Sequence, residues 1–99
     1  MFKLLILLPF LLLTGCSSSP YKLSKEAIKV EMLKRKPGRN SDCVVMAKVT
    51  GSHPEGSSEL AENMARNAAA DEGANSLFIE DTIANGKERK VEGTAYNCK

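Results

Sequence analysis

Aromatic and catalytic side chains are scarce in this sequence. It contains no tryptophan, only two tyrosines and three phenylalanines, and one histidine, His53. Histidine is the side chain most often used for proton transfer near neutral pH. Neither a GxSxG stretch nor a phosphate-binding glycine loop is present. These absences predict a protein that is not an enzyme and has no cofactor.

A strong net charge is also missing, since 14 basic side chains are balanced by 12 acidic ones. Nucleic-acid binding normally requires a basic stripe or a strongly basic domain, so we expect no nucleic-acid partner. The one local concentration of positive charge surrounds Pro37-Gly38 and consists of Lys34, Arg35, Lys36 and Arg39. This cluster is either a solvated turn or a contact site for anionic headgroups, lipopolysaccharide or an acidic partner.

The longest apolar run, Leu4 to Leu13, is too short to span a bilayer, which takes roughly 20 apolar residues. It follows the positively charged start Met1-Phe2-Lys3. A positive head and an apolar run of about 7–15 residues are typical of a secretory signal. A buried core helix is the alternative, but Pro9 would break it. The sequence therefore predicts a signal peptide over residues 1–15.

The cysteine that follows this run marks a processing site. Leu13-Thr14-Gly15-Cys16 resembles the lipobox of bacterial lipoproteins, in which the thiol receives a diacylglycerol and the new amine is acylated, as with palmitate. Two or more acyl chains give stable membrane anchoring. The resemblance implies lipidation at Cys16 and, because Ser17 is not an aspartate, retention at the cell outer membrane facing the periplasm. Residues 16–26 are then a lipidated tether, of which Ser17 to about Lys25 reaches about 30 Å at most.

Two cysteines remain for the small domain predicted over residues 27–99. Beyond a secretion signal the compartment is oxidising, so a disulfide between Cys43 and Cys98 is expected. These two thiols and His53 do not form a four-ligand zinc site, and we expect no metal. Strict alternation would place Glu80 and Asp81 on opposite faces of a strand, which argues against a paired-carboxylate or calcium site.

The hydrophobic pattern predicts a small α+β domain of β-β-α-β-β order, with the helix covering one face of an antiparallel sheet. The helix begins with Ser57 or Ser58 as N-cap, carries an alanine-rich stripe and ends at Gly73. Asn85-Gly86 signals a hairpin. The strands are expected at 27–33, 43–51, 76–83 and 88–98.

Antiparallel pairing of the second and fourth strands would bring Cys43 close to Cys98. The faces do not match in strict alternation, however. Because Ala95 faces the helix, Cys98 lies with Tyr96 on the face away from the helix. Cys43 shares a face with Ala47, so strict alternation would point the two cysteines to opposite sides of the sheet. Either a bulge near the end of the last strand corrects this, or Cys98 lies beyond the ladder.

Several motifs together resemble one family of small bacterial lipoproteins, the domain-of-unknown-function 4156 family. They are Pro37-Gly38, Cys43, the strand ending in Gly51, "ARNAAADEGAN" at 65 to 75 and "GTAYNC" at 93 to 98. The family is distantly similar in fold to RcsF, the outer-membrane lipoprotein that senses envelope stress. That likeness would imply four domain cysteines and a long proline-rich tether, and this chain departs from it on both points.

These observations predict a non-enzymatic interaction module that contacts an outer-membrane β-barrel or another envelope protein, as in envelope stress sensing. The exposed sheet face would be the contact surface, and Tyr96 its most anchor-like residue, although packing beside the disulfide is the other role open to it. The alternative is a structural or ligand-binding envelope lipoprotein that contacts lipid or cell-wall polymer through the basic turn at 34–39.

Overall fold

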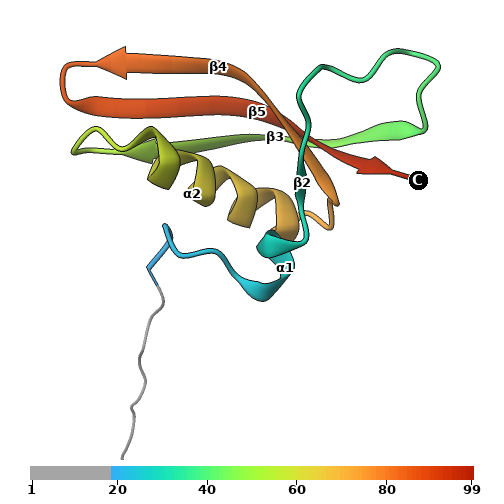
Figure 1. Cartoon of the computed structure of the whole chain (residues 1–99), viewed down its shortest axis with the longest axis horizontal. Coiled ribbons are helices and arrows are strands. Elements are labelled where there is room, and N and C mark those ends of the chain that lie inside the picture. The colour runs from blue at the N-terminus through green and yellow to red at the C-terminus, as the bar shows by residue number, and fades with distance from the viewer. Residues whose placement is uncertain (1–18) are drawn as a thin grey trace, which may run out of the picture.

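A four-stranded sheet with one long helix on one face makes up the domain (Figure 1). The computed structural model describes residues 19–99, so the predicted signal and Cys16 lie outside the described residues. The elements are α1 (Lys25–Ile28), β2 (Glu31–Met32), β3 (Cys43–His53), α2 (Ser58–Asp71), β4 (Ser76–Asn85) and β5 (Glu88–Cys98). The strand order is β2-β4-β5-β3. Within the described range, no helix is both long and apolar enough to cross a membrane.

The strands β4 and β5 form the predicted hairpin at the centre of the sheet. Asn85 pairs with Glu88 across the turn, and Gly86 has a φ of 64°, a left-handed conformation that glycine adopts without steric cost. On its other side β5 pairs antiparallel with β3, from Cys43 opposite Cys98 to His53 opposite Arg89. β3 therefore forms one edge of the sheet.

Helix α2 has the predicted limits and the predicted alanine face. The Ser57 hydroxyl accepts a hydrogen bond of 3.1 Å from the Leu60 amide, as an N-cap should, and Gly73 ends the helix with a φ of 80°. Ala61, Ala65 and Ala69 are fully buried against the sheet. These small side chains allow close approach: a Cβ at Gly51 of β3 would collide with the backbone of Ala61.

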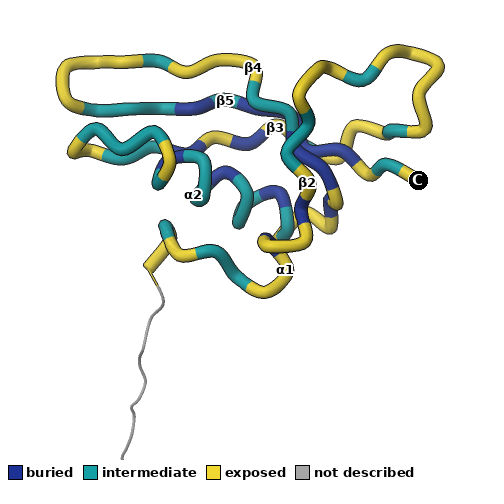
Figure 2. The backbone as a smooth tube through the Cα atoms, in the orientation of Figure 1, coloured by how far each residue is buried: buried dark blue, intermediate teal, exposed yellow. Residues whose placement is uncertain are grey.

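The core is a thin layer between α2 and the sheet. Figure 2 shows the buried residues along the middle of α2 and the facing strands, while the hairpin tip and the loop before β3 are exposed. The largest fully buried apolar side chains are Leu77, Val30 and Val91. A core with so few large side chains gives little stabilisation, as expected for a small domain.

The first predicted strand is the main difference from expectation. In place of a strand over 27–33, the structure has the short helix α1 and the two-residue strand β2, which pairs parallel with β4. The sheet is therefore mixed, and the prediction of a purely antiparallel sheet in β-β-α-β-β order was wrong. Ala27 and Val30, three residues apart, are buried, whereas Ile28 is 63% exposed, so burial here follows a helical turn and not a strand.

Residues of the expected tether lie against α2. The Asn67 side chain donates hydrogen bonds to the carbonyls of Pro20 (2.9 Å) and Lys22 (2.8 Å) and accepts one from the Ser24 amide (3.0 Å). One turn earlier on the helix, Asn63 donates to the Tyr21 carbonyl at 3.1 Å. From Ser19 onward, this segment is part of the folded structure.

Candidate functional site

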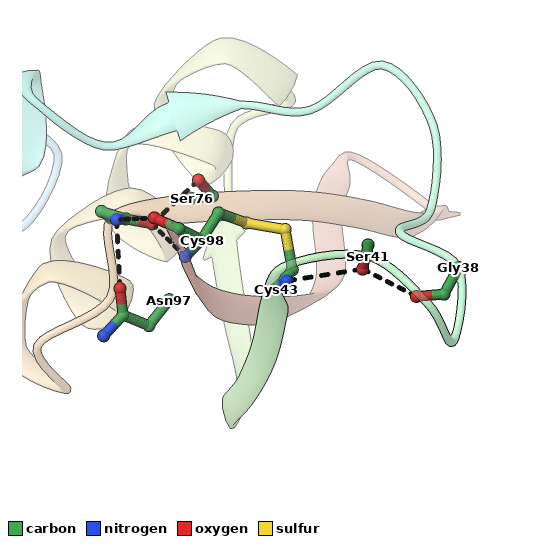
Figure 3. The surroundings of a disulfide bond; sticks show 7 residues. Gly38, Ser41, Cys43, Ser76, Asn97 and Cys98 are labelled. Atoms are coloured by element: carbon green, nitrogen blue, oxygen red, sulfur yellow. Dashed lines mark hydrogen bonds between the residues drawn. A yellow bond between two sulfur atoms is a disulfide. The ribbon is translucent and has the colours of Figure 1, made fainter.

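The predicted disulfide is confirmed. Cys43 and Cys98 lie directly opposite each other at the end of the β3–β5 ladder, with their Cα atoms 3.9 Å apart and a sequence separation of 55 (Figure 3). Both are part of the ladder, so Cys98 does not lie beyond it. Because this bond closes a long loop, it restricts the unfolded chain strongly.

A bulge resolves the mismatch of faces, and it lies in β3. The register of the β3–β5 pair shifts between Val45 and Ala47. Val45 pairs with Tyr96, on the face of β5 away from the helix, whereas Ala47 pairs with Ala95 on the helix face. One extra residue in a strand reverses the faces of all residues beyond it. The bulge that lets the two cysteines meet is therefore in β3 and not near the end of β5.

Asn75 holds the end of β5 in place beside the disulfide. Its side-chain amide nitrogen donates to the Cys98 carbonyl at 2.6 Å, and its oxygen accepts from the Cys98 amide at 2.8 Å. On the other strand, the Ser41 hydroxyl accepts from the Cys43 amide at 3.4 Å and donates to the Gly38 carbonyl at 2.7 Å (Figure 3). Both ends of the disulfide are thus fixed by local hydrogen bonds.

The predicted basic cluster lies in the exposed loop between β2 and β3. Lys34, Arg35, Lys36 and Arg39 are all exposed, and Lys36 alone among them forms an ion pair within the described chain, 3.9 Å from the Glu80 carboxylate. That contact shows that the loop lies on the sheet face opposite α2, here called the outer face. An exposed ion pair of this length contributes little to stability.

Glu80 is the centre of a polar cluster on the outer face. Its carboxylate accepts a hydrogen bond of 2.7 Å from the buried Thr94 hydroxyl and one of 3.2 Å from the Lys48 ammonium, which also donates to Thr94 at 3.0 Å. The β4 register shifts between Ile79 and Asp81, so strict alternation fails at the Glu80-Asp81 pair. The sequence argument from alternation does not apply at this position.

The hydrogen bond from Thr94 and then that from Lys48 lower the pKa of Glu80, while partial desolvation opposes them. A carboxylate held in its ionised form by donors does not serve as a proton acceptor near neutral pH. A shallow recess of about 310 Å³ lies beside it, lined by Lys48, Thr50 and Glu92 among others. We interpret this cluster as a structural link between β3, β4 and β5.

Tyr96, the anchor-like residue of the sequence analysis, is only 4% exposed. It lies on the outer face between Val45 and Ser76 and two residues before Cys98. Little of its ring is available to a partner in this conformation, so it fits the alternative role of packing beside the disulfide. Thr94, on the same face, is 2% exposed.

An exposed apolar group at the start of β3 was missed by the sequence analysis. Val44, Val45 and Met46 are 61%, 59% and 41% exposed, and Ile28 is the other large apolar residue exposed in residues 19–99. A signal was available in the sequence: three consecutive apolar residues in a strand cannot all point to one core face.

A groove of about 550 Å³ lies between the N-terminal segment and α2, with Leu23, Met64 and Ala68 among its apolar lining residues. Ser19 and Pro20 also line it. Its walls are the segment held by Asn67 and one side of the helix.

His53, the one histidine of the sequence, is half-buried. Its Nδ1 accepts hydrogen bonds from the amides of Glu55 (3.2 Å) and Ser57 (3.3 Å), and its ring contacts Tyr21 edge-on at 4.8 Å between centroids. These contacts give it a structural role at the start of α2.

Across residues 19–99, no group of three or more His, Cys, Asp or Glu side chains could hold a metal ion. No protein-family model, no curated protein and no solved structure matches the chain.

Proposed function

We propose that this protein is an outer-membrane lipoprotein, anchored through Cys16, whose periplasmic domain is a non-enzymatic interaction module that binds another envelope protein, as in stress sensing or signalling. The lipobox-like stretch before Cys16 and the resemblance of the mature chain to the domain-of-unknown-function 4156 family support the anchoring. On the outer face, Glu80, Lys48 and Thr94 satisfy one another, which supports a binding role over catalysis.

The observation that carries the proposal is the position of the N-terminal segment relative to the basic loop. Residues 19–24 lie against α2, whereas the loop with Lys36 lies on the outer face of the sheet (Figure 1). Cys16 precedes Ser19 by a stretch that spans about 10 Å at most. An anchor at Cys16 would therefore keep the α2 side near the membrane and turn the outer face and the basic loop away from it.

This geometry favours a protein contact over contact of the loop with headgroups of the same membrane. The alternative is a structural or ligand-binding envelope lipoprotein. In this orientation its ligand would be a polymer located away from that membrane. The exposed Lys34, Arg35 and Arg39, which form no ion pair within residues 19–99, support a polyanion as its ligand.

Photo-crosslinking in cells distinguishes the interaction module from the ligand-binding alternative. Probes at Lys48 and Glu92 report on the outer face, a probe at Arg39 reports on the loop, and one at the exposed Asp71 on α2 serves as the matched control. Adducts to one envelope protein from the outer face or loop, with none from Asp71, support the interaction module. Adducts from Arg39 alone, to polymer, would favour the alternative, whereas adducts from Arg39 to lipid would contradict the orientation argued above. The acyl mass on Cys16, absent in C16A, checks the anchor separately.

A further inference from the structure

We infer that the open half of the β3 edge, Val44–Thr50, is a strand-pairing site for an extended, acidic segment of another protein. This inference rests on the proposed interaction module and specifies its contact surface and the chemistry of its partner. Extended peptides commonly bind by adding a strand to a free sheet edge, with backbone hydrogen bonds providing much of the affinity.

The free edge is limited to one half of β3. β5 occupies one side of the strand along its whole length. On the other side, the Ser52 amide donates to the Met64 sulfur at 3.5 Å, so α2 occupies the edge at Ser52. At the near end the Cys43 amide donates to Ser41. Between these points β3 has no partner strand within residues 19–99.

The side chains at this edge are unusually apolar for a solvent-exposed strand. Val44, Val45 and Met46 are adjacent and exposed. Natural edge strands are usually protected by short length, charged residues or bulges. β3 is long, and its protection consists of the bulge between Val45 and Ala47 and of Lys48. Apolar side chains grouped at an open edge are typical of a site that a partner covers.

The charge around the edge indicates that the partner segment is negatively charged. The loop that leads into β3 carries four exposed cations, and its end is joined to the C-terminus by a hydrogen bond from the Lys99 amide to the Asp42 carbonyl. Lys36 of this loop and Lys48 of the edge are paired with Glu80, whereas Lys34, Arg35 and Arg39 form no ion pair within residues 19–99, and Asp42 is the one acidic residue of the loop. A second copy paired parallel along this edge would bring a second basic loop to the same end, which like-charge repulsion opposes, and sedimentation tests antiparallel self-pairing, in which the two loops lie at opposite ends. An acidic segment meets the same edge with attraction.

The disulfide makes the edge rigid before a partner arrives. Cys43 begins β3 and is bonded to Cys98, whose backbone Asn75 holds with two hydrogen bonds. The strand entering Val44 is therefore fixed in position. A pre-organised edge loses less conformational entropy on binding than a flexible one.

The test uses the purified mature protein and synthetic peptides of about ten residues, the upper end of ordinary strand length. The probe alternates valine with glutamate. One control peptide replaces glutamate by lysine, and another places proline at alternate positions to prevent strand pairing. NMR follows the amide signals and their hydrogen exchange, and sedimentation follows self-association.

We expect the glutamate peptide to bind at least about tenfold more tightly than the lysine peptide, and the proline peptide not to bind. Protection from exchange should increase within Val44–Thr50. V44N, M46N and K48E should weaken binding, whereas I28N, at the other exposed apolar residue, should not.

Absence of binding, equal binding of the two charged peptides, shifts confined to the loop, or dimers formed through β3 would each overturn the inference. This experiment requires neither cells nor a membrane. If the peptides do not bind but outer-face probes still crosslink in cells, only the edge site is rejected. If no probe gives specific crosslinks in cells, the interaction module itself is rejected.

Discussion

The Asn67 side chain accepts a hydrogen bond of 3.0 Å from the backbone amide of Ser24, which lies 43 residues earlier in the chain. The same side chain donates to the carbonyls of Pro20 and Lys22. One residue of α2 therefore fixes the path by which the chain enters the domain. If Cys16 carries the proposed lipid, Asn67 would help to keep the α2 side of the domain toward the membrane.

Asn67→Ala should release the N-terminal segment without unfolding the sheet. Three hydrogen bonds are lost, and we expect a decrease of about 1–3 kcal/mol in the free energy of unfolding. Trypsin should cleave after Lys22 and Lys25 faster than in the parent protein. Asn40→Ala, in the exposed loop, is the control and should change neither quantity. Equal cleavage rates for N67A and the parent would show that the segment is not held by Asn67.

Gly51→Ala should strongly destabilise the domain. Its Cβ would collide with the Ala61 carbonyl and lie 2.9 Å from the Ala65 backbone nitrogen, and neither backbone atom can move without displacing α2. We expect a loss of about 3 kcal/mol or more in urea unfolding, at the upper end of overpacking effects. Gly38→Ala is the matched control, since nothing lies within 4 Å of a Cβ there. A mild effect at Gly51 would mean that α2 packs less closely than described.

Removal of the Cys43–Cys98 disulfide should lower the free energy of unfolding by about 4 kcal/mol, the value expected for a loop of this length when the unfolded chain is released. The C43S/C98S variant and the parent protein in reductant should unfold at the same urea concentration. Oxidised parent protein should unfold at a clearly higher one. If reductant leaves the parent unchanged, the bond does not contribute to stability in solution.

The lowered pKa of Glu80 predicts a stability loss in acid. The folded protein holds this carboxylate ionised through Thr94 and Lys48, so its contribution is fully present above the pKa of the unfolded chain, about 4.3 for glutamate. The contribution is lost as the pH falls through the lower folded pKa. E80Q should flatten this part of the pH–stability curve, whereas the neighbouring D81N should not.

The substitution T94V tests the main cause of the lowered Glu80 pKa, the hydrogen bond from Thr94. Because the substitution removes the hydroxyl, the pKa of Glu80 should rise toward its ordinary value, as measured by the carbon-13 shift of the carboxylate. A lowered pKa that persists in T94V would assign the effect to Lys48 instead.

Local sequence patterns determined the central part of this fold. The β-branched residues after Cys43 form β3, the alanine stripe between Ser57 and Gly73 forms α2, and Asn85-Gly86 begins the turn between β4 and β5. The pairing of Cys43 with Cys98 also followed, because oxidation and antiparallel strands left no other partner in the domain. Each of these features depends on neighbouring residues or on simple chain geometry.

Tertiary contacts decided the rest. Ile28, Val30 and Met32 alternate as in a strand, yet the Arg66 guanidinium of the adjacent helix α2 donates to the carbonyls of Ala27 and Val30 and stabilises the end of α1. A contact from an arginine so far along the chain cannot be predicted from the hydrophobic pattern of the stretch around α1.

The bulge between Val45 and Ala47 is a second such case. It reverses the faces of β3, and the three apolar residues around it remain exposed because β3 is an edge strand. Sequence periodicity shows which residues can share a face. Only the packed structure decides where a strand gains an extra residue, because that position depends on the energy of the whole ladder and not on any single stretch of chain.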